Sequence, residues 1–377
     1  MLSLDENPLA DISVLGVHSP QLGFLNLSHD RGITDFGVLH SLTNLDQLLL
    51  GNCAVSDISF AAGMPRLGRL ELWETDVADI SPVAGLTNLY LLNLHNTGVT
   101  DLTPLTGRTN LTWLAIGWTG VTNFTPVTTL TSLTALHVGN LGLSNLAFLA
   151  PLTNLLELLA NENHLTGLPP YPHLCQLRYL ELSGNPLANV AFVSGMTNLW
   201  ALQVNYTGIG DLSPLTGRTN LHNLGLAGNG LTDLSALATL PYLGWVSLWE
   251  NHLQNIAPLA GLTNLGYLDL RYNWLDITPG SAAMTVIAAL QARGTTVDYD
   301  PQNAAPATIV LSAPTWLGGN QFRFTITSAS GAVLQVWRST DFAGWTSLGW
   351  LTNASGTTTF TDTAPPSGRS FYRAQQQ

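Results

Sequence analysis

The stretch Leu89–Asn110 reads LYLLNLHNTGVTDLTPLTGRTN and decides the fold, because its pattern recurs along most of the chain. Written from its first leucine, this 22-residue unit is L-x-x-L-x-L-x-x-N-x-L-x-D-L-x-P-L-x-x-L-T-N. A fixed period of this length indicates stacked repeats rather than two or three compact cores. A partial unit enters at Leu2, and the successive full units begin at Leu22, Leu45, Leu67, Leu89, Leu111, Leu133, Leu155, Leu177, Leu199, Leu221, Leu243 and Leu265.

Each position of the unit has a physical task. The L-x-L core alternates apolar and polar residues, which predicts a strand with one buried face and a parallel stack of such strands. Ser81-Pro82 and Ser213-Pro214 predict short 3₁₀ turns on the outer side, with serine as the N-cap and proline as the first helical residue. A small polar side chain at position nine is expected to bond to the backbone of the bend. Asparagine fills this position at Asn163, Asn185, Asn229, Asn251 and Asn273.

These residues resemble the leucine-rich repeat family, and the D-L-x-P-L-x-x-L-T-N half of the unit resembles the bacterial internalin type in particular. The resemblance covers residues 1–280 in about 12–13 repeats. It implies a repeat solenoid, a right-handed horseshoe with a parallel sheet on the concave side and short 3₁₀ turns on the convex side. It also implies a surface for binding and leaves the ligand unspecified.

The period stops after residue 280, and the composition changes twice. Residues 281–300 are predicted to form a C-terminal capping helix and strand, with Ser281 as the helix N-cap and Gly294 at its end. Residues 301–307 have the composition of a linker. Short alternating runs separated by turn residues over 308–377 predict a small all-β sandwich domain, which resembles immunoglobulin-like or fibronectin-III-like modules.

The N-terminal end differs from the C-terminal end because the repeat pattern is already running at Leu2. An uncovered solenoid end exposes apolar core and the unpaired edge of a strand. We therefore expect an N-terminal cap and an export signal to lie upstream of Met1. The alternative is an open edge through which an otherwise monomeric chain associates.

The charge of the chain excludes several classes of partner. The formal net charge is −12, and all 12 basic residues are arginines. Nucleic acid and anionic membrane surfaces both need clustered positive charge, so neither is an expected partner. No apolar stretch reaches the 18 residues of a membrane span. No phosphate loop, hydrolase elbow or zinc-protease motif occurs, so we predict no enzyme, no cofactor and no metal site.

Large aromatic residues gather at unit positions three, five, seven and eight, which the solenoid places on its concave face. Five of the seven tryptophans before residue 280 fall on these four positions. Exposed aromatic patches are typical of binding surfaces. The predicted ligand-binding residues are the aromatic Trp73, Trp113, Trp118, Tyr179, Tyr206, Trp245, Trp249, Tyr267 and Tyr272, with the acidic Glu71, Glu157 and Glu181.

These residues separate into two clusters. The N-terminal cluster is Trp73, Trp113 and Trp118, and the C-terminal cluster is Trp245, Trp249, Tyr267 and Tyr272. An acidic stretch with Glu157, Glu162 and Glu181 lies between the clusters and would suit a partner of basic and apolar character. The alternative interpretation is that neighbouring rings cover one another and only smooth the sheet.

The function predicted from these features is non-enzymatic recognition or adhesion by a secreted or cell-surface protein that binds a macromolecule, with a protein as the first choice. Two alternatives stay open. The first is a glycan-binding module, since aromatic rings also stack on sugars. The second is a structural or self-associating surface protein, which the open N-terminal edge would favour.

Overall fold

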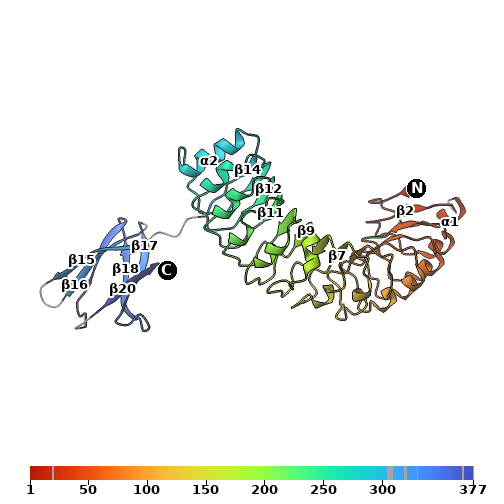
Figure 1. The fold of residues 1–377 in the computed structure, drawn as a ribbon, viewed down its shortest axis with the longest axis horizontal. Coiled ribbons are helices and arrows are strands. Elements are labelled where there is room, and N and C mark those ends of the chain that lie inside the picture. The colour runs from red at the N-terminus through yellow and green to blue at the C-terminus, as the bar shows by residue number, and fades with distance from the viewer. Residues whose placement is uncertain (19–20, 304–308, 318–320, 329, 367–368, 377) are drawn as a thin grey trace. The chain divides into compact units, whose positions relative to one another are not determined.

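The computed structural model describes residues 1–18, 21–303, 309–317, 321–328, 330–366 and 369–376. The chain divides into two compact units, Met1–Asn303 and Ala304–Gln377, which are drawn in Figure 1. Among the described residues, no helix is long and apolar enough to cross a membrane. Each unit is described here by itself.

The first unit is a solenoid built on one parallel sheet, which confirms the predicted repeat architecture. Within the described residues the sheet has 14 strands in sequence order, and from β2 to β13 each strand residue pairs with the residue one repeat later. In Figure 1 the stacked strands follow a curved arc. The strands are β1 (Leu2–Ser3), β2 (Phe24–Asn26), β3 (Gln47–Leu49), β4 (Arg69–Glu71), β5 (Leu91–Asn93), β6 (Trp113–Ala115), β7 (Ala135–His137), β8 (Glu157–Leu159), β9 (Tyr179–Glu181), β10 (Ala201–Gln203), β11 (Asn223–Gly225), β12 (Trp245–Ser247), β13 (Tyr267–Asp269) and β14 (Thr296–Asp298).

Short 3₁₀ helices follow the strands and form the other side of each repeat. The first repeat instead has a single α-helical turn, α1 (Leu15–His18). The 3₁₀ helices are η1 (Gly37–Ser41), η2 (Ser59–Gly63), η3 (Ser81–Gly85), η4 (Thr103–Leu105), η5 (Val127–Thr129), η6 (Ala147–Leu149), η7 (Pro172–Gln176), η8 (Ala191–Gly195), η9 (Ser213–Leu215), η10 (Ser235–Thr239) and η11 (Ala257–Gly261).

The capping of these turns differs from the sequence prediction. Ser81 and Ser213 are the first residues of η3 and η9 rather than their N-caps. The capping group is the aspartate two residues earlier, and Asp211 Oδ1 accepts the Ser213 N–H at 2.8 Å. Such an Asx turn presents its side-chain oxygen to the backbone two residues on, which a serine at the first helical position cannot do.

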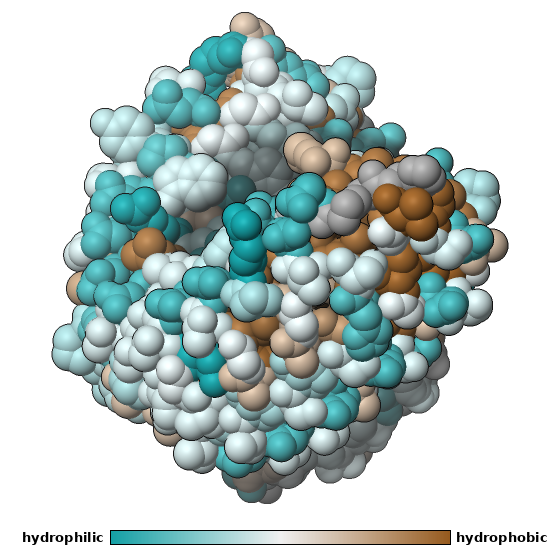
Figure 2. Space-filling view, turned by 90° about the vertical axis from the view of Figure 1, so that its right-hand side faces the viewer, coloured by the Kyte–Doolittle hydropathy of each residue, from teal (hydrophilic) through white to brown (hydrophobic). Residues whose placement is uncertain are grey.

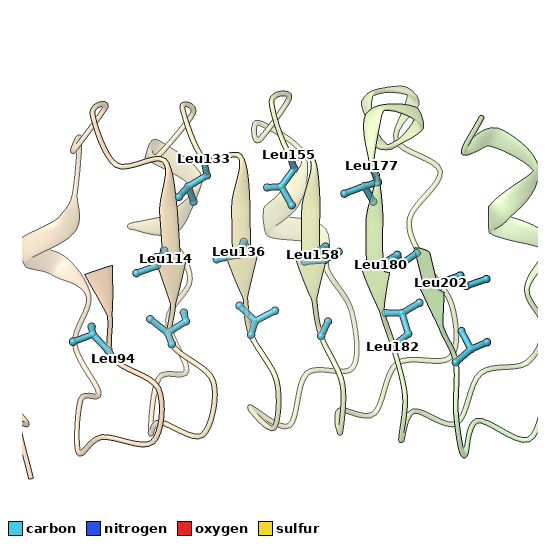
Figure 3. Packing of buried hydrophobic residues seen from close by; sticks show 14 of the residues in the cluster. Leu94, Leu114, Leu133, Leu136, Leu155, Leu158, Leu177, Leu180, Leu182 and Leu202 are labelled. Carbon is cyan, nitrogen blue, oxygen red and sulfur yellow. The ribbon is translucent and has the colours of Figure 1, made fainter. Parts of the chain in front are cut away.

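The core of the solenoid consists of leucine rows that run along the stack. Leu114, Leu136, Leu158, Leu180 and Leu202 are the position-four leucines of five neighbouring repeats, and each is fully buried (Figure 3). Burying one leucine side chain contributes roughly 1.5–3 kcal/mol. Because every repeat adds the same row members, the core extends along the stack instead of closing into a sphere.

A ladder of asparagine side chains links neighbouring bends through hydrogen bonds. The Asn251 amide nitrogen donates to the carbonyls of Leu248 at 2.9 Å and Leu226 at 3.0 Å. Its Oδ1 accepts the N–H of Leu231 at 2.9 Å and of Asn229 at 3.1 Å. The position-nine side chain therefore satisfies backbone groups of its own repeat and of the preceding repeat, as expected from the sequence.

The last repeat is followed by α2 (Ala282–Gln291) and β14. Ser281 caps the helix by accepting the Met284 N–H, and Ile287 and Leu290 are buried. Of the predicted linker, residues 301–303 bond to the last repeat, because the Pro301 carbonyl accepts the Tyr272 N–H at 2.7 Å. Residues 304–307 of that prediction lie outside the described residues.

The second unit is a small antiparallel β domain. Two three-stranded sheets, in the orders β15-β16-β19 and β18-β17-β20, enclose a core that includes Phe324, Ile326, Leu334 and Val336. Residue 308, where the predicted sandwich begins, lies outside the described residues. The strands are β15 (Val310–Leu317), β16 (Gln321–Thr327), β17 (Ala332–Ser339), β18 (Thr346–Asn353), β19 (Thr357–Asp362) and β20 (Phe371–Gln376).

Figure 2 looks at the N-terminal side of the first unit and shows a hydrophobic patch there. Among the described residues of this region, Met1, Val14 and Val17 are exposed, and Val17 keeps 76% of its surface accessible. Leu2 and Leu4 are only partly buried against the core. This end of the stack thus presents apolar side chains, whereas α2 and β14 cover the other end.

Candidate functional site

The candidate site lies on the sheet face opposite the leucine rows. Strand alternation buries positions four and six of each repeat, so positions three, five and seven face the other way. Position eight follows the strand in a left-handed backbone conformation, with φ of +57° at Trp118, +55° at Tyr206 and +57° at Tyr272. The same left-handed conformation recurs at position eight of the repeats from His29 to Tyr272, so it belongs to the bend of the repeat and is not particular to this site.

A hollow of about 830 Å³ lies on this face toward its C-terminal half. We call it the C-terminal depression. It brings Tyr206, Trp245, Trp249 and Tyr272 together with Glu181, all of which the sequence predicted as site residues. Its full lining is Asn161, Glu162, Glu181, Ser183, Gly184, Asn205, Tyr206, Trp245, Ser247, Trp249, Asp269, Arg271 and Tyr272.

The aromatic rings of the depression meet nearly at right angles. Trp249 lies between Tyr206 and Tyr272, with ring centroids 5.8 Å and 6.3 Å away and interplanar angles of 82° and 62°. Tyr206 and Tyr272 are 46% and 39% exposed, so their rings are available to a ligand. Trp245 is half-buried and stacks on Tyr267 at 5.7 Å.

A glycine explains how Tyr206 reaches Trp249 across an intervening repeat. The repeat between them has Gly228 at position eight, with φ +64°. A Cβ atom there would come within 2.3 Å of the Tyr206 ring. The absent side chain lets the Tyr206 ring lie over this residue, and its hydroxyl donates to Glu250 Oε2 at 2.8 Å.

Several charged groups line or adjoin the depression. Asp269 is 4% exposed and accepts two hydrogen bonds from the Arg271 guanidinium, at 2.6 and 2.9 Å, and this pairing raises the Arg271 pKa. Burial raises the pKa of Glu181, although its Oε1 accepts the Ser183 N–H at 2.8 Å. Burial and the hydrogen bond to Glu250 raise the pKa of Tyr206.

The N-terminal cluster is packed differently. Each of its tryptophans contacts a histidine of another repeat: Trp73 contacts His29, Trp118 contacts His95 and Trp113 contacts His137, with centroids 5.0, 4.9 and 4.6 Å apart. All three tryptophans are half-buried. These contacts are those of the alternative interpretation, in which neighbouring rings cover one another, and binding by the N-terminal cluster stays a prediction.

The remaining predicted site residues lie outside the C-terminal depression. Glu71 pairs with Arg69 and accepts a hydrogen bond from Trp73 Nε1 at 3.2 Å. Glu157 Oε1 lies 2.5 Å from His137 Nε2. Tyr267 donates to Asp298 at 2.8 Å, and burial together with this bond raises its pKa to about 12.

Tyr179 lines a second hollow of about 440 Å³ with Arg178, Trp200 and His222. These residues lie at the N-terminal ends of β9, β10 and β11. Trp200 stacks on His222 with centroids 5.9 Å apart, and His222 stacks on Tyr242 at the same separation. The sequence analysis missed this aromatic row, because it counted rings only at four positions. Trp200 and His222 stand at position two of successive repeats and Tyr242 is the last residue of its unit, so rings counted at these two positions would have revealed the row.

Sequence reasoning also missed the polar lining of the depression. Asn161, Ser183, Asn205, Ser247 and Arg271 stand at positions five and seven, as several predicted residues do, but carry no aromatic ring. The usable signal was their shared position in the repeat. A position-by-position reading would therefore have included them.

The side chains that could bind a metal ion or act as thiols lie apart from one another or have partners of their own. In the described part of the chain, no three His, Cys, Asp or Glu side chains gather to hold a metal ion. Glu157 and Glu181 of the acidic stretch lie on adjacent repeats and take separate partners, in His137 and the Ser183 amide. Cys53 is buried and donates to the Leu27 carbonyl at 2.9 Å, and burial raises its pKa to about 11.

Comparison with known proteins places this architecture among solved leucine-rich repeat structures. The chain is similar to an internalin, InlF, of Listeria monocytogenes, with 30% identity and a TM-score of 0.63 over 75% of this chain and 82% of that one. It is similar in fold to a leucine-rich repeat protein of Leptospira interrogans, with 19% identity and a TM-score of 0.59 over 80% of this chain and 90% of that one.

A third similar structure is a plant peptide hormone receptor, RGFR1, in complex with RGF2, with 18% identity and a TM-score of 0.53 over 74% of this chain and 47% of that one. At this identity the likeness concerns the fold alone. No protein-family model matches the chain, and no curated protein matches it either.

Proposed function

This chain belongs to the internalin-like leucine-rich repeat proteins, and from this premise we propose that it is a non-enzymatic recognition protein that binds a protein ligand on its concave face. The observation that carries the proposal is the C-terminal depression, where Tyr206, Trp245, Trp249 and Tyr272 line one hollow. Tryptophan and tyrosine are the residue types that dominate binding hot spots.

The rigidity of the solenoid supports this function. The depression is built on strands whose backbone is paired on both sides and on bends held by the asparagine ladder. A preformed surface loses little conformational entropy when a ligand binds, so more of the contact energy appears as affinity. The plant receptor of the same fold forms a complex with RGF2, which is a fold-level analogy for binding on a repeat solenoid.

We further propose that the protein works outside the cell, secreted or at the cell surface, with the second unit as a spacer or attachment domain. The negative net charge of the full chain and its exposed aromatic residues suit an extracellular encounter with another macromolecule. Fractionation of the native source with an antibody against the solenoid would test this location. Recovery of the protein only from the cytoplasm would contradict it.

The binding proposal is tested with peptides selected on the full chain from a random peptide library. The double variant Trp245→Ala and Trp249→Ala should weaken the best selected peptides by at least about tenfold, because it removes two hot-spot rings. The matched control is Trp73→Ala, which removes a half-buried concave tryptophan outside the depression and should leave affinity unchanged. Thermal unfolding by circular dichroism checks that each variant folds.

Two results would overturn the proposal. Equal affinity of the selected peptides for the wild type and the double variant would remove the depression from the binding surface. A glycan array that yields ligands dependent on Trp245 and Trp249, while the peptide library yields none, would replace the protein ligand with a glycan.

A further inference from the structure

We infer that the C-terminal depression recognises a positively charged side chain, a lysine or an arginine of the protein ligand, held between aromatic rings and carboxylates. This inference rests on the proposed function and specifies the chemistry of its ligand. It follows from the charge of the lining, the geometry of the rings and the placement of the acids around them.

The lining carries more negative than positive charge. It holds three carboxylates, Glu162, Glu181 and Asp269, and one guanidinium, Arg271, so its formal charge is −3 + 1 = −2. Arg271 is bonded to Asp269 through two of its nitrogens, so the charges of these two side chains largely balance each other. The charges that remain for a ligand are those of Glu162 and Glu181.

Glu181 supplies one of the two remaining carboxylates of the lining. Its carboxylate is half-buried and, among the residues that the structure describes, forms no salt bridge with an arginine or histidine. Burial raises its pKa, which shows that the surrounding protein disfavours the charged form. An incoming ammonium or guanidinium would supply the missing opposite charge, and the pair would be less screened than at an open surface.

The aromatic rings are the second group of side chains that would contact the cation. Tyr206, Trp249 and Tyr272 form successive walls at angles of 82° and 62°. A cation over the face of an aromatic ring is attracted by its negative π surface, most strongly over tryptophan. The rings contact one another edge to face, and the exposed surface of Tyr206 and Tyr272 is where a cation can lie against them.

Glu250 lies outside the lining but adds a carboxylate beside Tyr206. Its Oε2 accepts the Tyr206 hydroxyl at 2.8 Å, which holds an exposed carboxylate beside the outermost ring. An approaching cation would therefore be attracted by Glu250 as well as by Glu162 and Glu181. An anionic ligand would be repelled at each of these positions, and a neutral one would leave the Glu181 carboxylate uncompensated.

The inference is tested with four synthetic peptides, Ac-Leu-Xaa-Leu-Xaa-Leu-NH₂, in which Xaa is lysine, arginine, glutamine or glutamate. Their binding to the full-length protein is measured by isothermal titration calorimetry and by tryptophan fluorescence. The lysine and arginine peptides should bind about tenfold more tightly than the glutamine peptide, because only they offer a cation to the rings and acids. The glutamate peptide should bind weakest of the four, and 0.5 M NaCl should reduce the preference for the basic peptides.

The decisive variant is Glu181→Gln, which keeps an oxygen for the Ser183 amide but removes the charge. It should cut the preference for lysine over glutamine by at least about fivefold, whereas the matched control Glu74→Gln, an exposed acid of another repeat, should not change it. A glutamine peptide that binds as tightly as the lysine peptide would overturn the inference. So would an unchanged preference in a folded Glu181→Gln variant.

The inference and the proposed function fail in different ways. If library-selected peptides depend on Trp245 and Trp249 but carry no basic residue, the recognition function stands and the cationic ligand is wrong. If neither the library nor the four peptides bind, the recognition function itself fails.

Discussion

At the scale of single residues, the position-nine asparagine shows how a repeat protein turns a local bond into a link between repeats. One side chain donates within its own repeat and to the preceding one, and its oxygen accepts from the preceding bend. Thr75 and Thr97 at the same position form only the local bond, each hydroxyl donating to the carbonyl three residues earlier. The asparagine repeats should therefore be coupled more strongly to their neighbours than the threonine repeats.

We predict that Asn251→Ala destabilises the solenoid by about 3 kcal/mol or more, because it leaves buried backbone donors and acceptors without partners at roughly 1–3 kcal/mol each. The measurement is urea unfolding followed by far-UV circular dichroism. The matched control is Asn264→Ala, which loses one exposed bond to the Pro241 carbonyl and should cost well under half as much. Equal losses in the two variants would show that the ladder contributes no special stability.

At the scale of elements, most of the 3₁₀ helices begin at the residue whose N–H an Asx side chain two residues earlier accepts, as in η2, η9 and η10. Asp57, Asp211 and Asp233 each accept the N–H and the hydroxyl of the serine two residues later, and these bonds hold the pKa of each carboxyl below its usual value. Asn123 makes the same backbone bond to Thr125 without a charge. The chain thus contains charged and neutral versions of one element.

These two versions should respond differently to acid. A lowered folded-state pKa adds stability that is present above the unfolded value, near 3.9, and is lost as the pH falls through the folded value. The triple variant Asp57→Asn, Asp211→Asn and Asp233→Asn should therefore have a lower Tm than the wild type at pH 6, and the difference should close below about pH 4. Calorimetry in 0.5 M NaCl, which screens the net charge, measures this difference.

The reverse change serves as the control. Asn123→Asp should raise the Tm at pH 6 and lose this gain below about pH 4. A Tm difference that stays constant between pH 6 and pH 3 in both variants would contradict the assignment of the aspartates as caps.

At the scale of the whole molecule, the two ends of the solenoid have different surfaces. The C-terminal end is covered by α2 and β14, whereas the N-terminal side shows a hydrophobic patch (Figure 2). Met1, Val14 and Val17 are exposed apolar residues of the N-terminal segment. Apolar side chains gathered on one end favour contact with another apolar surface. This is the feature that supports the structural or self-associating alternative.

We predict that the protein is a monomer at low concentration and associates through this end as the concentration rises. Val17→Glu, which places a charge on an exposed position of α1, should shift the onset of association to higher concentration without lowering the Tm. Light scattering over a concentration series measures the mass. Trp350→Glu, at an exposed aromatic residue of the second unit, is the control, and an equal shift in both variants would move the contact away from the N-terminal side.

The candidate site was predictable in part. Position in the repeat was enough to place Tyr206, Trp249 and Tyr272 on one face. The period is constant, so residues at the same position of different repeats point in the same direction relative to the sheet. Their gathering into one hollow depended on Gly228, whose missing side chain lets rings two repeats apart meet. The N-terminal cluster has the same ring types at the same positions, yet its tryptophans pack against histidines.

The sequence by itself determined the period, the parallel sheet, the 3₁₀ turns and the inward leucines and asparagines, because each of these depends on contacts that repeat every 22 residues. The tertiary structure alone decided which rings stay open, which acids remain unpaired and where the surface is hollow. Those properties depend on contacts between side chains of different size in different repeats, and no local pattern encodes such contacts.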